Sequence, residues 1–179
     1  MPTLPPMPDR NPADVLDLPN DYWFVARTKP RQEKKFARWL LGRGVPFFLP
    51  MRTRQRSWRN RRITSQEPLL AGYVFFIANI EMAHKVYDSG SVAGRMDVND
   101  QDGLVAELKR IDQLLRTGRG LSEVMGLIAG REVEITAGPC AGLRGVIAQS
   151  DKGTQLVVKL DLLGRSLQVP LEPSEVEAI

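Results

Sequence analysis

The sequence has few of the residues on which many catalytic and metal sites depend. A single cysteine, Cys140, and a single histidine, His84, occur in 179 residues. One cysteine cannot form a disulfide within the chain, and the two residues cannot supply the ligands of a multi-cysteine zinc site. We therefore expect a protein that has no disulfide framework, uses no metal or other cofactor, and is not an enzyme.

Long apolar runs are also missing. The run from Tyr73 to Ala78 is far shorter than the roughly 20 residues that a membrane helix needs. The first 20 residues contain neither the basic start nor the apolar stretch of a signal peptide. These absences predict a cytoplasmic protein with no membrane partner, which we expect to be a monomer.

Acidic residues are scarce in one part of the chain. Residues 22–62 contain thirteen Lys or Arg and one acid, Glu33, although the net charge of the whole chain is only +4. Arginine pairs with phosphate through two hydrogen bonds, and an indole ring stacks on bases. We therefore predict a nucleic-acid-binding segment, with a solvated basic loop as the alternative; its residues are Arg52, Arg54, Arg56, Trp58, Arg59, Arg61 and Arg62.

Hydrophobic patterning predicts an α+β domain over residues 21–117, in which helices pack on an antiparallel sheet. Six prolines in residues 1–20 predict a disordered tail before it. Aromatic and β-branched residues predict strands at 22–26, 45–49, 73–77 and 91–98. Apolar residues at helical spacing predict helices near 31–41, 80–87 and 104–115. The basic segment 51–66 lacks sustained alternation, so we expect a hairpin or a mobile loop there.

The period of the pattern changes after Gly118 and Gly120, which predict a linker over residues 118–127. Residues 128–179 alternate in short segments, as at Leu156, Val158 and Leu160. Short strands separated by Gly/Pro turns are typical of a small all-β barrel. The predicted architecture is thus an α+β sandwich linked to a C-terminal barrel.

An N-terminal segment and a C-terminal segment, separated by the predicted linker, resemble the NusG family of transcription elongation factors. Residues 130–147 are similar to the KOW motif, which begins a small SH3-like barrel, and residues 162–165 and 169–177 resemble the ending of the family's sequences. The N-terminal match consists of residues 22–25, a basic helix, residues 47–50 and residues 72–75. The resemblance covers residues 21–179. It implies a NusG N-terminal domain followed by a KOW domain.

The resemblance also implies partners and binding residues. The family's N-terminal domain binds the clamp helices of the largest RNA polymerase subunit through an apolar concavity. The residues at the matching positions are Trp23, Phe24, Leu69, Leu70 and Tyr73. The arginine segment would then contact upstream or non-template DNA, with an acidic polymerase loop as the alternative.

In the family, the KOW domain recruits a small-subunit ribosomal protein or the termination factor Rho. The matching positions here are Cys140, Leu143, Leu163 and Arg165. Common family members carry aromatic residues where this chain has Cys and Leu. This difference favours a specialised antitermination paralogue of the RfaH type. The alternative function is a KOW-containing protein that binds RNA or associates with the ribosome.

Overall fold

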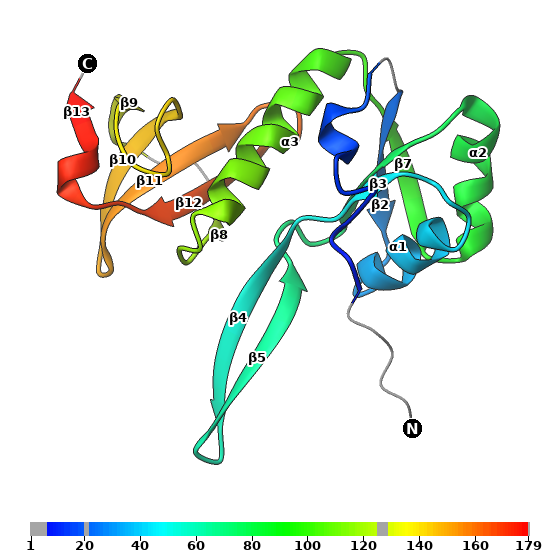
Figure 1. Cartoon of the computed structure of the whole chain (residues 1–179), viewed down its shortest axis with the longest axis horizontal. Coiled ribbons are helices and arrows are strands. Elements are labelled where there is room, and N and C mark those ends of the chain that lie inside the picture. Colours follow the sequence, from blue (N-terminus) through cyan, green and yellow to red (C-terminus); the bar gives the residue numbers. More distant parts are fainter. Residues whose placement is uncertain (1–6, 20–21, 125–128, 179) are drawn as a thin grey trace. The chain divides into compact units, whose positions relative to one another are not determined.

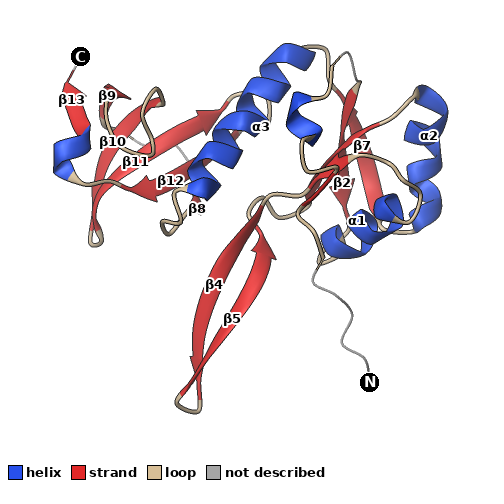
Figure 2. Ribbon diagram, viewed as in Figure 1, coloured by secondary structure: helices blue, strands red, loops and turns tan. Residues whose placement is uncertain are grey.

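Two units make up the chain, and Figures 1 and 2 show the path of the backbone through each. The computed structural model describes residues 7–19, 22–124 and 129–178. The first unit is Met1–Asp102 and the second is Gly103–Ile179. Helices are combined with antiparallel sheets, so this part of the predicted fold class is confirmed.

The first unit is built around a five-stranded sheet with the strand order β1-β3-β6-β2-β7. All neighbouring strands in this sheet are antiparallel. Aromatic and β-branched residues dominate its central strands, and such residues fit a pleated, buried surface. The strands are β1 (Arg10–Asn11), β2 (Trp23–Thr28), β3 (Phe47–Phe48), β6 (Tyr73–Ile77) and β7 (Val92–Asp97).

Helices α1 (Glu33–Leu41) and α2 (Ile80–Lys85) contribute to one core cluster, and a 3-10 turn, η2 (Val86–Ser89), continues α2. The apolar stripe predicted for the first helix is confirmed, since Phe36 and Leu40 are buried and Trp39 packs at the edge of the cluster. Gly42 caps the C-terminal end of α1. The cluster joins these helices to the sheet through Phe24, Ala26, Phe47, Val74 and Phe76.

The basic segment forms a β-hairpin. Strands β4 (Met51–Trp58) and β5 (Arg61–Pro68) make a separate two-stranded sheet, which projects as an arm in Figure 1. Arg59 and Asn60 both have positive φ, at 47° and 62°, as a two-residue type I′ turn requires. This resolves the choice between a hairpin and a loop.

The predicted disordered tail is wrong for residues 7–19. There β1 pairs with β3, and a 3-10 turn, η1 (Val15–Asp17), buries Val15 and Leu16. The guanidinium of Arg10 lies 4.8 Å from the centroid of the Phe48 ring. Prolines are compatible with a short edge strand and turns, so their number did not exclude structure. Residues 1–6 and 20 of the predicted tail lie outside the described residues.

The second unit contains most of α3 (Gln101–Arg116) and a six-stranded antiparallel sheet, ordered β13-β9-β10-β11-β12-β8. Leu156, Val158 and Leu160 are buried as predicted, but Gln155 and Val157 are buried too, so burial does not alternate along this part of the strand. The strands are β8 (Ser122–Val124), β9 (Arg131–Ile135), β10 (Arg144–Ser150), β11 (Gly153–Leu160), β12 (Arg165–Pro170) and β13 (Val176–Ala178), with a 3-10 turn, η3 (Pro173–Glu175), before the last.

The boundary between the units differs from the predicted linker. The chain divides after Asp102, and residues 122–124 of the predicted linker form β8, which pairs with β12. Leu121 is buried, and Arg119 makes two hydrogen bonds to Glu175. The two nearby glycines therefore mark turns between packed elements. Residues 125–127 lie outside the described residues. No helix in the described part of the chain is long and apolar enough to cross a membrane.

Candidate functional site

Two of the predicted polymerase-binding residues lie on the sheet face opposite the α1–α2 cluster. Side chains alternate between the faces of a strand. Trp23 in β2 and Tyr73 in β6 are neighbours of the cluster residues Phe24 and Val74, so they point to the opposite face. Leu69 and Leu70 lie in the turn before β6, where the Tyr73 backbone N–H donates to the Leu70 carbonyl at 3.3 Å. We call Trp23, Leu69, Leu70 and Tyr73 the second-face patch.

The second-face patch is buried in this structure. Its most accessible side chain, Tyr73, is 9% exposed, and Leu70 is 0% exposed. The family resemblance implied an apolar concavity at these positions, and hydropathy alone could not show whether these residues face solvent. A contact made by these four side chains requires the patch to become accessible.

Phe24, the fifth predicted residue, belongs to the core on the α1 side of the sheet. Its ring stacks on Phe76 with centroids 5.6 Å apart, and the Arg95 guanidinium lies 5.0 Å from its centroid. The strand alternation therefore separates Phe24 from Trp23. The neighbouring Tyr22 is 51% exposed, and its ring is tilted against Phe24.

Glu33, which was not among the predicted site residues, holds the turn of the second-face patch. Its side chain is buried at the start of α1 and accepts the Gly72 backbone N–H at 2.8 Å. Gly72 has a φ of +83°, in the region that favours glycine, and its carbonyl accepts the Thr28 N–H at 2.9 Å. The bond from Glu33 thus links α1 to the turn between Leu70 and Tyr73.

The pairing register of the hairpin sorts its side chains into two different faces. Arg52 pairs with Glu67, Arg56 with Ile63, and Trp58 with Arg61. Directly paired residues lie on the same face, and so do residues two apart along a strand. The arginine face consists of Arg52, Arg54, Arg56, Trp58, Arg61, Ile63, Ser65 and Glu67. The opposite face consists of Met51, Thr53, Gln55, Ser57, Arg62, Thr64, Gln66 and Pro68.

Four of the six predicted arginines therefore lie together, whereas Arg62 lies on the opposite face and Arg59 in the turn. All residues from 53 to 64 are exposed, including Trp58 at 63% and Ile63 at 48%. The turn residue Arg59 places its guanidinium 5.7 Å from the centroid of the Trp58 ring. The arginine face thus combines positive charge with two accessible apolar side chains.

One carboxylate, that of Glu67, lies at the base of the arginine face. It faces Arg52 at 3.8 Å, Arg54 at 3.4 Å and Arg56 at 3.5 Å. One negative charge shared among three arginines leaves the face strongly positive. Sequence reasoning missed Glu67 because its position opposite Arg52 depends on the register, which the turn at Arg59 and Asn60 sets.

Three of the four candidate partner-binding residues of the second unit are buried, whereas Arg165 is partly exposed. Cys140 is 0% exposed, Leu143 4% and Leu163 7%. Burial raises the pKa of the Cys140 thiol, which keeps the group neutral. Arg165 pairs with Glu123 of β8. In a unit this small, the apolar loop residues are needed for the core.

Helix α3 makes polar contacts with two loops of the second unit. Gln113 donates through Nε2 to the carbonyls of Pro139, at 3.3 Å, and Ala141, at 3.0 Å. Glu107 accepts the Leu162 backbone N–H at 3.0 Å. Burial raises the pKa of the Glu107 carboxyl, and its hydrogen bonds with the Leu162 and Asp161 backbone oppose the rise. The loops held in this way carry Cys140 and Leu163.

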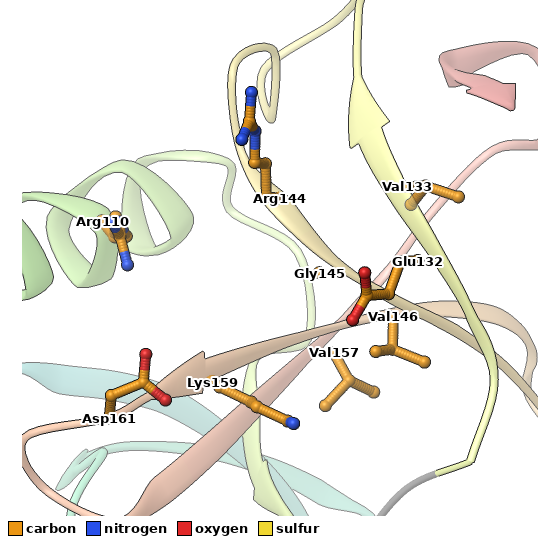
Figure 3. A pocket seen from close by; sticks show the side chains of 9 residues that line it. All are labelled: Arg110, Glu132, Val133, Arg144, Gly145, Val146, Val157, Lys159 and Asp161. Atoms are coloured by element: carbon orange, nitrogen blue, oxygen red, sulfur yellow. The ribbon is translucent and has the colours of Figure 1, made fainter. Parts of the chain in front are cut away.

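A cavity of about 310 Å³ opens between α3 and strands β9 to β11 of the second unit. Figure 3 shows Arg110 of α3 and Asp161 on one side, and the strands on the other. Cationic and acidic side chains both line it, from Arg110, Arg144, Lys159, Glu132 and Asp161. The described residues contain no group of three or more His, Cys, Asp or Glu placed to hold a metal. This mixed lining favours neither an anionic nor a cationic ligand.

The family comparison extends over most of the first unit and into the second. A model of the family described as transcription termination factor nusG matches residues 21–133, which is more than half of the chain. The chain belongs to the NusG family. No curated protein matches it. Membership of the NusG family places the chain among transcription termination and elongation factors. The matched residues include the second-face patch and the whole arginine hairpin.

Proposed function

We propose that the chain is a transcription elongation or antitermination factor that binds RNA polymerase and favours processive transcription. The family match over residues 21–133 carries this proposal. The proposed protein is a cytoplasmic monomer without enzymatic activity or a cofactor. An operon-specific paralogue of the RfaH type is the proposed subclass, because Cys and Leu stand where common relatives have aromatic residues.

The proposed polymerase contact is the second-face patch, docked on the clamp helices of the largest subunit. Aromatic side chains provide large contact areas at a low cost in conformational entropy. Tyr73 is the proposed anchor, because it joins a ring to a hydroxyl group at the most accessible point of the patch. Binding through this patch includes a step that uncovers it.

Two further contacts complete the proposal. The arginine hairpin contacts upstream or non-template DNA, and its positive charge supports an interaction made mainly with phosphates. The second unit acts as a KOW domain that recruits a small-subunit ribosomal protein or Rho. Because Cys140, Leu143 and Leu163 are buried, recruitment through them needs a rearrangement of their loops.

Transcription in vitro through a pause site and a Rho-dependent terminator tests the polymerase contact. Tyr73→Ala should abolish the change in pausing and readthrough that the wild type produces, and Tyr73→Leu should weaken it while preserving an apolar side chain. Tyr87→Ala is the matched control, since Tyr87 is 47% exposed on η2. A folded Tyr73→Ala variant with full activity would contradict the proposal.

Affinity capture separates this proposal from the alternative of an RNA-binding or ribosome-associated protein. The tagged full chain is incubated with lysate treated with nuclease. Retention of RNA polymerase subunits supports the elongation factor. Retention of ribosomes without polymerase supports the alternative and contradicts the docking role of the second-face patch.

A further inference from the structure

We infer that the arginine face of the β4–β5 hairpin is a binding site for single-stranded nucleic acid, in which arginines hold phosphates and Trp58 stacks on an unpaired base. The inference deepens the DNA contact proposed above by selecting one face of the hairpin and one form of the ligand. It does not depend on docking to polymerase.

Charge provides the first argument. The exposed residues 53–64 contain five arginines and no acidic residue. Strand alternation places Arg54, Arg56 and Arg61 on the same side of the ribbon, with Arg52 nearer its base. A row of guanidinium groups on one side can follow a single phosphate backbone, since each planar fork pairs with phosphate through two hydrogen bonds.

The apolar groups decide between single-stranded and duplex nucleic acid. Trp58 is 63% exposed and lies on the same face as the arginines, and Ile63 there is 48% exposed. In a duplex the faces of the bases are stacked on one another, and the grooves present only base edges. An unpaired base can instead place its π face on the indole ring. Trp58 can therefore stack on a base of a single strand without the cost of unstacking a duplex, which favours a single strand.

The opposite face lacks these features. It carries Thr53, Gln55, Ser57, Thr64 and Gln66, with Arg62 as its one charged residue. On this face the Gln66 side-chain amide donates a hydrogen bond to the Thr53 hydroxyl at 2.8 Å. The hairpin consequently offers a polyanion one face with four arginines and one face with a single arginine, and we assign the ligand to the face with four.

Two neighbouring arginines provide a matched test. Arg61 lies opposite Trp58 on the arginine face, and Arg62 lies opposite Ser57 on the other face. Both are exposed on β5, and neither makes an ion pair within the described part of the chain. Arg61→Gln and Arg62→Gln therefore remove the same charge at adjacent positions. The full chain is titrated against a labelled single-stranded oligonucleotide of mixed sequence, and against the same sequence as a duplex, across a range of salt concentrations.

We expect Arg61→Gln to reduce the slope of log affinity against log salt by about 0.7 for the single strand, and Arg62→Gln to leave it unchanged. Trp58→Ala should weaken single-strand binding by about tenfold while leaving duplex binding unaltered. Trp58→Phe, which keeps an aromatic ring, should restore most of the affinity. Tryptophan fluorescence confirms that each variant is folded.

Equal losses in Arg61→Gln and Arg62→Gln would overturn the assignment to one face. Tighter binding of the duplex, or single-strand binding that is insensitive to Trp58→Ala, would overturn the choice of ligand. These outcomes are separate from the transcription assay with Tyr73 variants. Failure here with a normal effect on transcription refutes the single-strand site alone, whereas the reverse result refutes the polymerase contact alone.

Discussion

Glu107 of α3 accepts the backbone N–H of Leu162 through one carboxylate oxygen, whereas its other oxygen, Oε2, is buried without a hydrogen-bond partner among the described residues. An unsatisfied buried oxygen is costly, and it is more costly when it is charged. Burial of the charged Glu107 carboxylate therefore costs stability near neutral pH, although the hydrogen bond from Leu162 itself favours the ionised form. Protonation of Glu107 should therefore stabilise the second unit.

Mild acid should strengthen the packing of α3 on the second unit. Burial raises the folded-state pKa of Glu107, so the stabilisation from its protonation is complete below the unfolded value of 4.5 and is lost as pH rises through the folded pKa. Hydrogen exchange of the β11 amides, corrected for their intrinsic rates, should show greater protection as the pH is lowered from neutral towards 4.5. Glu107→Gln removes the titrating group, so protection that still rises with acid in this variant would contradict the assignment.

The ion pair between Arg119 and Glu175 should have the opposite dependence on pH. Its hydrogen bonds of 2.7 and 2.9 Å lower the pKa of Glu175, so its stabilisation is present above the unfolded value of 4.5 and is lost as pH falls through the folded pKa. Arg119→Gln should destabilise the second unit by about 2 kcal/mol at neutral pH. Arg116→Gln is the control, because Arg116 is 76% exposed.

Hydrogen exchange is the suitable measurement for both variants, because all three tryptophans lie in the first unit and do not report on the second. Similar losses of protection in both variants would count against a special role for Arg119.

Gly72→Ala should destabilise the first unit by about 1–2 kcal/mol, the cost of placing a residue with a Cβ in the left-handed region. The φ of Gly72 is +83°, and a Cβ there would have only the Thr28 carbonyl oxygen nearby, at 4.0 Å, so the cost comes from the backbone. Gly94→Ala in β7 is the control, because its φ is not positive and a Cβ there would have open space. Urea unfolding followed by tryptophan fluorescence compares the two. Equal midpoints would show that the turn adapts to alanine.

Glu67→Gln should increase the affinity of the full chain for single-stranded DNA by about two- to fivefold. Three arginines share the Glu67 carboxylate, and exposed ion pairs of this kind contribute about 0.2–1 kcal/mol. Removing the carboxylate frees these arginines for phosphate and removes a negative charge from the face. Anisotropy titration measures the change. A fall in affinity would instead mean that Glu67 positions the arginines for binding.

The sequence predicted the elements of the first unit well where apolar periodicity was strong. Phe36 and Leu40 marked the buried side of α1, and the continuous run at β6 marked a strand covered on both faces. The hairpin register was not predictable from alternation, because charged and polar residues occupy both of its faces. It follows from two residues with positive φ, Arg59 and Asn60, and neither is the glycine that usually marks such a turn.

Prediction of the candidate site was weaker because hydropathy does not distinguish a core from a docking surface. Trp23, Tyr73 and Leu163 are apolar or aromatic in either role, and their burial depends on contacts between distant segments. The predicted tail failed for a similar reason. Val15 and Leu16 are two apolar residues among prolines, and the segment gains its structure from pairing with β3, which its local composition does not reveal.

At the base of the arm formed by β4 and β5, the Leu69 N–H donates to the Pro50 carbonyl at 2.8 Å, and Lys34 of α1 donates to the Gln66 carbonyl. Its outer residues, from 53 to 64, are all solvent-exposed. Substitutions along the arm can therefore accumulate without disturbing the core beneath α1. Under the proposed function, the nucleic acid that the arm prefers could therefore change during evolution without altering the polymerase contact of the second-face patch.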